Sequence, residues 1–134
     1  MTGDGEATSG GDTRRGRATT GDDDRLWATI DALRTWLDDS NRQPPREALL
    51  LRILKISEEA GEVAEAVIGA IGQNPRKGVS HTWQDVEAEL CDVVVTALVA
   101  LGTLTPDPRA ALSAHVAALA ERAGRTVDGP GARP

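Results

Sequence analysis

Two short acidic motifs in the middle of the chain carry the residues best suited to chemistry. Glu59-x-x-Glu62 and Glu89-x-x-Asp92 each place two carboxylates three residues apart, which is about one helical turn and puts both on the same side of a helix. Carboxylate oxygens are hard ligands that suit magnesium or manganese. If the two helices face each other, the motifs form a four-carboxylate cradle for a divalent cation, most simply magnesium, with positions left for water and phosphate oxygens.

The setting of the second motif favours a metal site. Segment 86–104 is apolar nearly all round, and Glu89 and Asp92 interrupt it. An ionised carboxylate in such surroundings costs several kcal/mol unless a positive charge compensates it. The nearest basic residues precede the segment, in the loop that contains Lys77. The first motif taken alone is equally consistent with an ordinary solvated helix face.

Four helical segments are predicted to position these motifs. Their expected bounds are about 25–39, from Pro45 to about 71, from Thr82 to about 104, and from 108 to about 124. The second opens with Pro, which a first turn tolerates, and Thr82 with Asp85 forms a capping box for the third. Short connections favour an all-α fold, an antiparallel four-helix bundle.

One apolar stripe on the second helix sets the expected direction of the first motif. The stripe consists of Leu49, Ile53, Ile56, Ala60, Val63, Val67 and Ile71. At about 100° per residue, Glu59 and Glu62 point away from it. The third helix should be buried on most sides, because its apolar residues surround it.

Composition divides the chain into one domain and two tails. Residues 1–24 are mostly Gly, Thr, Asp and Arg, and such a segment buries too little apolar surface to order, so it is expected to be a disordered tail. Residues 126–134 are rich in Gly and Pro and are assigned to a second disordered tail. The helical domain is therefore expected at 25–125, a normal domain size.

Charge and cysteine content narrow the functional classes. The formal net charge is −6, with no basic stripe, which argues against a binder of duplex nucleic acid. One cysteine excludes an intrachain disulfide and fits a reducing compartment. The longest apolar run, 93–101, is too short to span a bilayer. We therefore expect a cytoplasmic protein with no membrane partner.

One arrangement of residues across the second and third predicted helices is shared with a known family. It consists of Lys55, Glu58-Glu59-x-x-Glu62, Glu89-Leu-Cys-Asp92 and the apolar run that follows Asp92. This pattern resembles the MazG-like, all-α nucleoside triphosphate pyrophosphohydrolases, to which dimeric dUTPases and dCTP pyrophosphatases are related. The likeness covers the second and third helices well and the first and fourth only loosely.

The resemblance implies an enzyme that hydrolyses a nucleoside triphosphate, NTP or dNTP, between the α- and β-phosphates, giving a monophosphate and pyrophosphate. It also implies that Glu59, Glu62, Glu89 and Asp92 are the magnesium ligands. Glu58 would position or deprotonate the attacking water. Members of the family usually assemble as homodimers or larger homo-oligomers, with the substrate site near the subunit interface.

A triphosphate also needs protein cations and a surface for its base. Lys55 lies one turn before Glu59, and Lys77 lies in the loop before the third helix; the alternative for each is an ordinary surface charge. Any of the three tryptophans could stack on a base, although Trp at helical spacing is more often a core residue. Trp83 is preferred because it opens the third helix beside the loop.

Two alternatives to an enzyme stay open. The chain could keep the fold and bind nucleotide or a partner without catalysis, which its divergent first helix and long N-terminal tail favour. It could also be a self-associating bundle whose acidic face is merely solvated.

Overall fold

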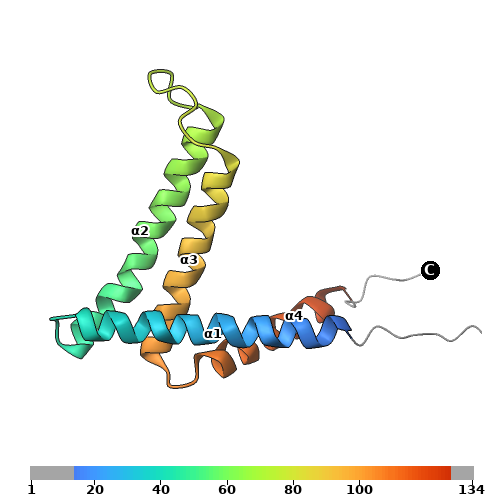
Figure 1. The fold of residues 1–134 in the computed structure, drawn as a ribbon. Helices are drawn as coiled ribbons and strands as arrows, with labels where there is room; N and C mark the ends of the chain where they lie inside the picture. Colours follow the sequence, from blue (N-terminus) through green and yellow to red (C-terminus); the bar gives the residue numbers. More distant parts are fainter. Residues whose placement is uncertain (1–13, 128–134) are drawn as a thin grey trace, which may run out of the picture.

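The computed structural model describes residues 14–127, with side chains from residue 20 to residue 124. Over this range the chain forms helices and no strand, which confirms the all-α class. The helices are α1 (Arg14–Ser40), α2 (Pro45–Ile71), α3 (Trp83–Leu104) and α4 (Pro108–Val127) (Figure 1). Residues 1–13 and 128–134, which form parts of the tails expected at 1–24 and 126–134, lie outside the described residues.

Helices α2 and α3 form an antiparallel hairpin whose ends the sequence specifies (Figure 1). Helix α2 begins with Pro45 and ends at Gly72, whose φ of 65° is the left-handed conformation that glycine adopts readily. The predicted capping box of α3 is present: Thr82 Oγ1 accepts from the Asp85 backbone N–H, and Asp85 accepts from the Thr82 N–H at 2.7 Å. These bonds from Thr82 lower the pKa of Asp85.

Helix α2 contacts α3 through a different face from the one that the sequence predicts. The buried positions of α2 are Ala48, Glu59, Ala66 and Gly69, and the wider apolar stripe is left partly outside, with Ile53 41% and Ile71 57% exposed. Small side chains let the two helix backbones approach closely. Glu59 lies in the seam between α2 and α3 and faces the third helix, as the predicted cradle requires.

Helix α1 crosses the base of the hairpin instead of lying along it (Figure 1). Ile30 of α1 packs against Leu98 and Val99 of α3, and Leu112 of α4 joins this core. Helix α4 turns away from α3 by 114°. The described helices thus differ from the expected four-helix bundle, because only α2 and α3 run side by side along their length.

The first helix is longer than the sequence predicts. Helix α1 begins at Arg14, so residues 14–24, which the sequence assigns to a disordered tail, are helical. Asp23 and Asp24 in this segment form ion pairs with Arg109 of α4, the second at 2.6 Å. These long-range pairs stabilise a stretch that has no apolar periodicity. Helix α4 likewise continues to Val127, past the expected boundary at 125.

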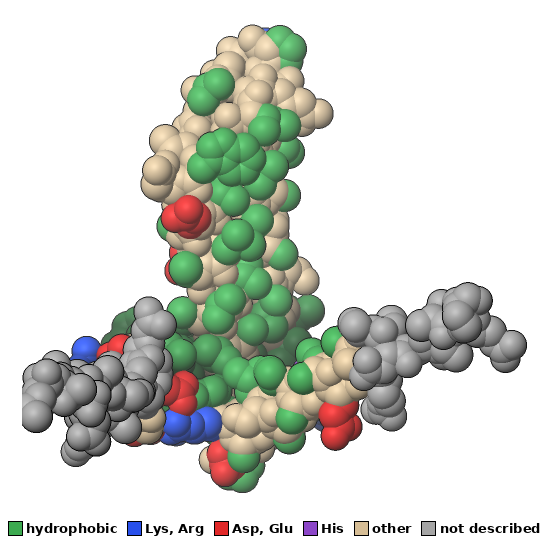
Figure 2. Space-filling model, turned by 90° about the vertical axis from the view of Figure 1, so that its right-hand side faces the viewer, with side chains coloured by type: hydrophobic (Ala, Val, Ile, Leu, Met, Phe, Trp, Pro, Cys, Tyr) green, Lys and Arg blue, Asp and Glu red, His purple; other side chains and the backbone are tan. Residues whose placement is uncertain are grey.

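Much apolar surface of the hairpin remains exposed. Figure 2 shows hydrophobic side chains following one of its faces from base to tip. Helix α3 buries Val86, Leu98, Val99 and Ala100, whereas Leu90 and Val94 are about half exposed. The expectation that α3 is buried on most sides is therefore wrong, since α1 covers it only near its C-terminal end.

No single helix among the described residues is long and apolar enough to cross a membrane. Helices α3 and α4 reach that length and composition only when they are taken together across their bend.

Two glycines of α2 lie in contrasting surroundings. A Cβ at Gly69 would meet Ser80 Oγ at 2.6 Å and the ring of His81, because the chain after the loop crosses α2 there. The Ser80 backbone N–H donates to the Gly69 carbonyl at 3.0 Å, which fixes this crossing. A Cβ at Gly61 would meet nothing within 4 Å.

These surroundings predict opposite effects of the same substitution. Gly69→Ala should lower the free energy of unfolding by about 1–3 kcal/mol, because the loop must move to admit a methyl group. Gly61→Ala should raise it by up to about 1 kcal/mol, because alanine loses less conformational entropy on entering a helix. Urea unfolding followed by circular dichroism measures both. Equal effects of the two substitutions would contradict the close approach at Gly69.

Candidate functional site

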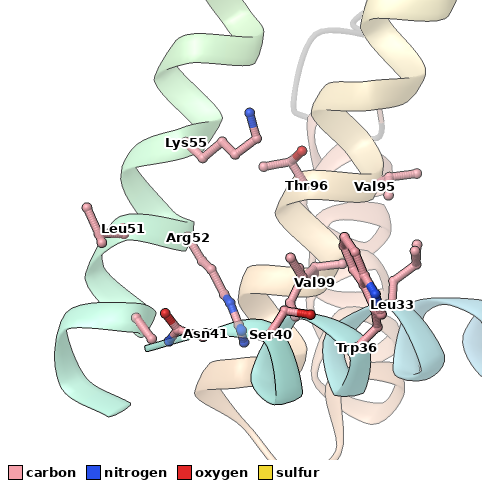
Figure 3. A pocket seen from close by; sticks show the side chains of 12 residues that line it. Leu33, Trp36, Ser40, Asn41, Leu51, Arg52, Lys55, Val95, Thr96 and Val99 are labelled. Atoms are coloured by element: carbon pink, nitrogen blue, oxygen red, sulfur yellow. The ribbon is translucent and has the colours of Figure 1, made fainter. Parts of the chain in front are cut away.

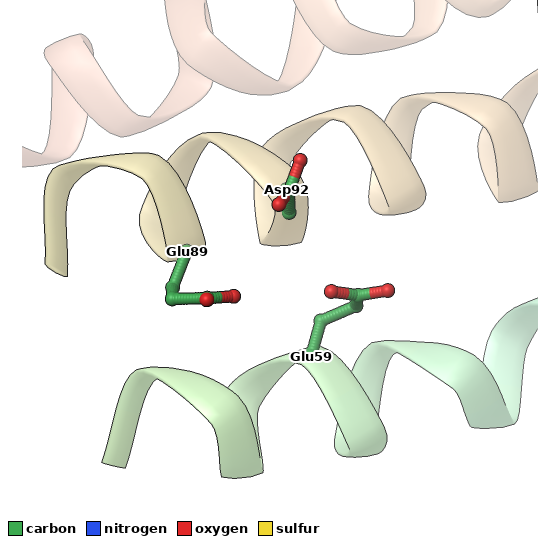
Figure 4. A group of neighbouring side chains, drawn as sticks. All are labelled: Glu59, Glu89 and Asp92. Carbon is green, nitrogen blue, oxygen red and sulfur yellow. The ribbon is translucent and has the colours of Figure 1, made fainter. Parts of the chain in front are cut away.

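Three carboxylates converge in the seam of the hairpin. Glu59 on α2 faces Glu89 and Asp92 on α3 (Figure 4), and one oxygen of each lies within 4.8 Å of an oxygen of the other two. Glu59 is only 7% exposed, Glu89 is half-buried and Asp92 is exposed. The cluster thus has a buried end and an end open to solvent, as a site for a hydrated cation requires.

Lys55 partly compensates this charge. Its Nζ lies 2.8 Å from Glu59 Oε1 and 3.3 Å from Glu58 Oε2. Hydrogen bonds to Glu59 and then Glu58 raise the pKa of Lys55, so the ammonium form is favoured. A buried carboxylate requires such a partner. One lysine against the three converging carboxylates still leaves a net negative site.

Glu62 lies beside the cluster and outside its converging oxygens. Its pKa is raised, first by the negative charge of Glu59, then by partial burial and by Glu89. The field of the cluster therefore reaches Glu62. The structure brings together three of the four predicted ligands and leaves the fourth as an exposed neighbour.

Glu58, the predicted residue for activating water, lies on the solvent side of α2. Its side chain is 63% exposed, and its carboxylate holds Lys55. A carboxylate in this position can accept a proton from water at the open side of the cluster. The same position also suits a plain surface ion pair.

The structure places Lys77 and Trp83 away from the cluster, near the loop end of the hairpin. Lys77 lines a small cavity of about 200 Å³ with Glu65, Asn74 and His81. Trp83 is 58% exposed at the first turn of α3. From Trp83 to Asp92, α3 rises roughly 13 Å. Neither residue is gathered into the acidic cluster.

A larger cavity lies on the α1 side of the acidic cluster, whereas Lys77 and Trp83 lie on its loop side. It has a volume of about 420 Å³ and is mostly apolar. Figure 3 shows Lys55 and Thr96 at one end of it and Ser40, Asn41 and Arg52 at the other. Lys55 lies one turn from Glu59, and Thr96 lies one turn from Asp92. One end of the cavity therefore lies about one helical turn from Glu59 and Asp92.

Sequence reasoning missed the importance of Trp36 and Arg52. Trp36 lines the cavity from α1 and is 64% exposed, whereas sequence reasoning preferred Trp83 as the residue that stacks on a base. Arg52 lines the same cavity from α2. Neither role is visible in the sequence, because the cavity exists only where α1 crosses the hairpin. Thr96 was detectable, since it continues the stripe of Glu89 and Asp92.

The donor set fits a hard divalent cation. All the converging atoms are carboxylate oxygens, which magnesium and manganese prefer. The raised pKa of Glu62 reports an excess of negative charge that a bound cation would relieve. Three carboxylates, one lysine and an adjoining apolar cavity together suit a ligand with an anionic end and an apolar end.

Comparisons with models of protein families, with curated proteins and with solved structures find no match to this chain. The likeness to MazG-like enzymes therefore rests on the two acidic motifs and Lys55.

The raised pKa of Glu62 predicts a pH-dependent gain from removing its charge. A raised pKa means that the folded chain holds the proton more tightly than the unfolded chain, so stability falls as pH rises from the ordinary glutamate value through the folded value. In EDTA at pH 7, Glu62→Gln should therefore melt at a higher temperature than wild type, and the difference should shrink towards pH 4.

Differential scanning fluorimetry measures this effect, with Glu65→Gln as a matched control one turn further along α2. Saturating magnesium should stabilise wild type more than Glu62→Gln, since the variant has less charge for a cation to relieve. A lower melting temperature of Glu62→Gln in EDTA at pH 7 would contradict the repulsion described above.

Proposed function

We propose that this chain is a magnesium-dependent nucleoside triphosphate pyrophosphohydrolase with a MazG-like fold. The observation that carries the proposal is the convergence of Glu59, Glu89 and Asp92 next to Lys55, whose side chain pairs with Glu59 and also lines an apolar cavity. A nucleoside triphosphate has the matching shape, a polyanion joined to a largely apolar base and sugar. A divalent cation held by the three carboxylates would supply the positive charge that the phosphates of such a substrate need.

The acidic residues have distinct roles in this proposal. Glu59, Glu89 and Asp92 hold magnesium, and Glu62 supports it from the edge of the cluster. When bound, magnesium neutralises charge on the phosphates and polarises them towards attack. Glu58 orients water and accepts its proton. The water oxygen bonds to phosphorus while the α–β bridging bond breaks, which gives a nucleoside monophosphate and pyrophosphate.

Lys55 and the cavity bind the rest of the substrate. The Lys55 ammonium, beside Glu59, supplies a positive charge for a phosphate oxygen. The cavity of about 420 Å³ is large enough for a base and sugar. Trp36 on its wall offers an aromatic face for stacking, which makes it a better candidate than Trp83. Lys77 is a candidate for phosphate contact only if a second copy or a loop movement brings it closer.

A homodimer accounts for the apolar surface that one copy leaves exposed. On α2, Leu50, Leu54 and Ile68 are 48%, 64% and 43% exposed, and Gly61 has open space between them. One chain supplies a two-helix hairpin, so two hairpins packed face to face would complete the expected four-helix bundle.

Pyrophosphate release tests the enzymatic proposal. We expect magnesium-dependent release from at least one member of a panel of canonical, deoxy and modified triphosphates. Asp92→Asn should reduce turnover by at least roughly a hundredfold, since it removes a charged ligand, while leaving the helical circular-dichroism signal unchanged. Glu87→Gln, an exposed residue of the same helix, is the matched control and should be active.

The same panel decides between the two candidate functions. Stabilisation of the protein by magnesium and nucleotide without any product would favour the non-catalytic binder. No product and no stabilisation by any member of the panel would refute both and favour a merely solvated acidic face.

The dimer predicts a change of mass on placing a charge in the apolar face of α2. Wild type should sediment as a dimer or larger oligomer, and Leu54→Asp should sediment as a smaller species, because a buried unpaired carboxylate is costly. Val116→Asp changes a similarly exposed residue of α4 and serves as the control. A monomeric wild type at micromolar concentration would refute the dimer.

A further inference from the structure

We propose that Arg52 is a positioning residue that holds the nucleoside cavity open by bracing α1 and α3 against α2. The inference rests on the proposed function, because it assigns the cavity to the nucleoside part of a triphosphate. In this role, Arg52 affects the affinity for substrate and has little effect on the rate of the chemical step.

The geometry of Arg52 links three helices. Its Nη1 donates to Asp38 Oδ1 on α1 at 2.7 Å and to Thr103 Oγ1 on α3 at 2.9 Å. The side chain is only 12% exposed. The Thr103 hydroxyl donates its own hydrogen to the Val99 carbonyl at 2.9 Å, so its oxygen is available to accept from Arg52.

The Asp38 end of this brace is itself held in place. Asp38 Oδ2 accepts from Arg34 Nη1 at 2.8 Å, so two guanidinium groups share one carboxylate. Arg34 is in turn bound to Asp31 at 2.7 Å. Charged hydrogen bonds of this kind are directional and stronger than neutral ones. The C-terminal part of α1 is therefore fixed relative to α2.

The cavity needs such a brace because its walls belong to different helices. Leu33 and Trp36 come from α1, Leu51 from α2, and Val95 and Val99 from α3. Helix α1 packs on α3 through Ile30, whereas the ion pair of Arg52 with Asp38 ties it to α2. Apolar walls that are free to move close on one another, since this removes their surface from water. Arg52 opposes that closure and keeps Trp36 at a set distance from α2.

Steady-state kinetics with the best substrate of the triphosphate panel tests this role. Arg52→Met keeps the length of the side chain and removes its donors. It should raise KM at least roughly tenfold, because a misplaced wall weakens binding, with kcat within about twofold of wild type. Thr103→Val removes one of the two bonds and should raise KM less. Arg46→Met, at an exposed position of α2, is the control for loss of charge and should leave KM unchanged.

Binding of a triphosphate analogue with an α,β-methylene bridge, measured by calorimetry with magnesium, separates this inference from the proposed function. A Kd that rises with KM in Arg52→Met supports the inference. If wild type turns over no triphosphate, the enzymatic proposal fails, and weaker analogue binding by Arg52→Met still supports the brace. An unchanged Kd, or wild type that binds no analogue, overturns it.

Folding is checked by circular dichroism. If Arg52→Met fails to fold, Thr103→Val and Arg52→Lys decide the question. Lysine keeps the charge opposite Asp38 and lacks the planar fork, so it should show an intermediate KM. A fall in kcat at constant KM in these folded variants overturns the proposal.

Discussion

The close packing of α2 against α3 is the contact on which the rest of the structure depends. Ala48 and Ala66 are buried positions of α2, and Gly69 is buried against Ser80 and His81 of the segment that leads into α3. The seam between α2 and α3 contains Glu59, which is thereby held opposite Glu89 and Asp92. A larger residue in place of Ala66 would separate both the helices and the carboxylates. Packing and the candidate chemistry therefore share one interface.

The carboxylates at this interface also carry an electrostatic cost. Carboxylates in a helix seam repel one another in a medium that screens poorly, and the raised pKa of Glu62 reports that repulsion. The positive charge of Lys55, on the same helix as Glu59, offsets part of this repulsion. A fold selected for stability alone could place apolar residues at these positions at lower cost. In the proposed function, a bound cation would offset this cost.

The sequence predicted the parts of the fold that local chemistry determines. Pro45, the capping box of Thr82 and Asp85, and Gly72 mark helix ends through bonds within a few residues, and these bounds are confirmed. The start of α1 was missed because its support, the pairing of Asp23 with Arg109, joins residues far apart in sequence. The inward face of α2 was misjudged for a related reason. Periodicity finds the larger apolar stripe, but which stripe meets α3 depends on the partner helix.

The cavity could not be predicted either, because it depends on how α1 packs against the hairpin. It adds residues to the candidate site that the sequence motifs do not contain. Glu59, Glu89 and Asp92 were recognisable from spacing, whereas Trp36 and Arg52 gain a role only where α1 crosses the hairpin. The ion pair of Arg52 with Asp38 joins positions 14 residues apart, across a helix break that leaves no periodic signal. The acidic cluster can thus be predicted from motifs on two helices. The part of a site that would select one nucleotide over another depends on how a third helix is held against them.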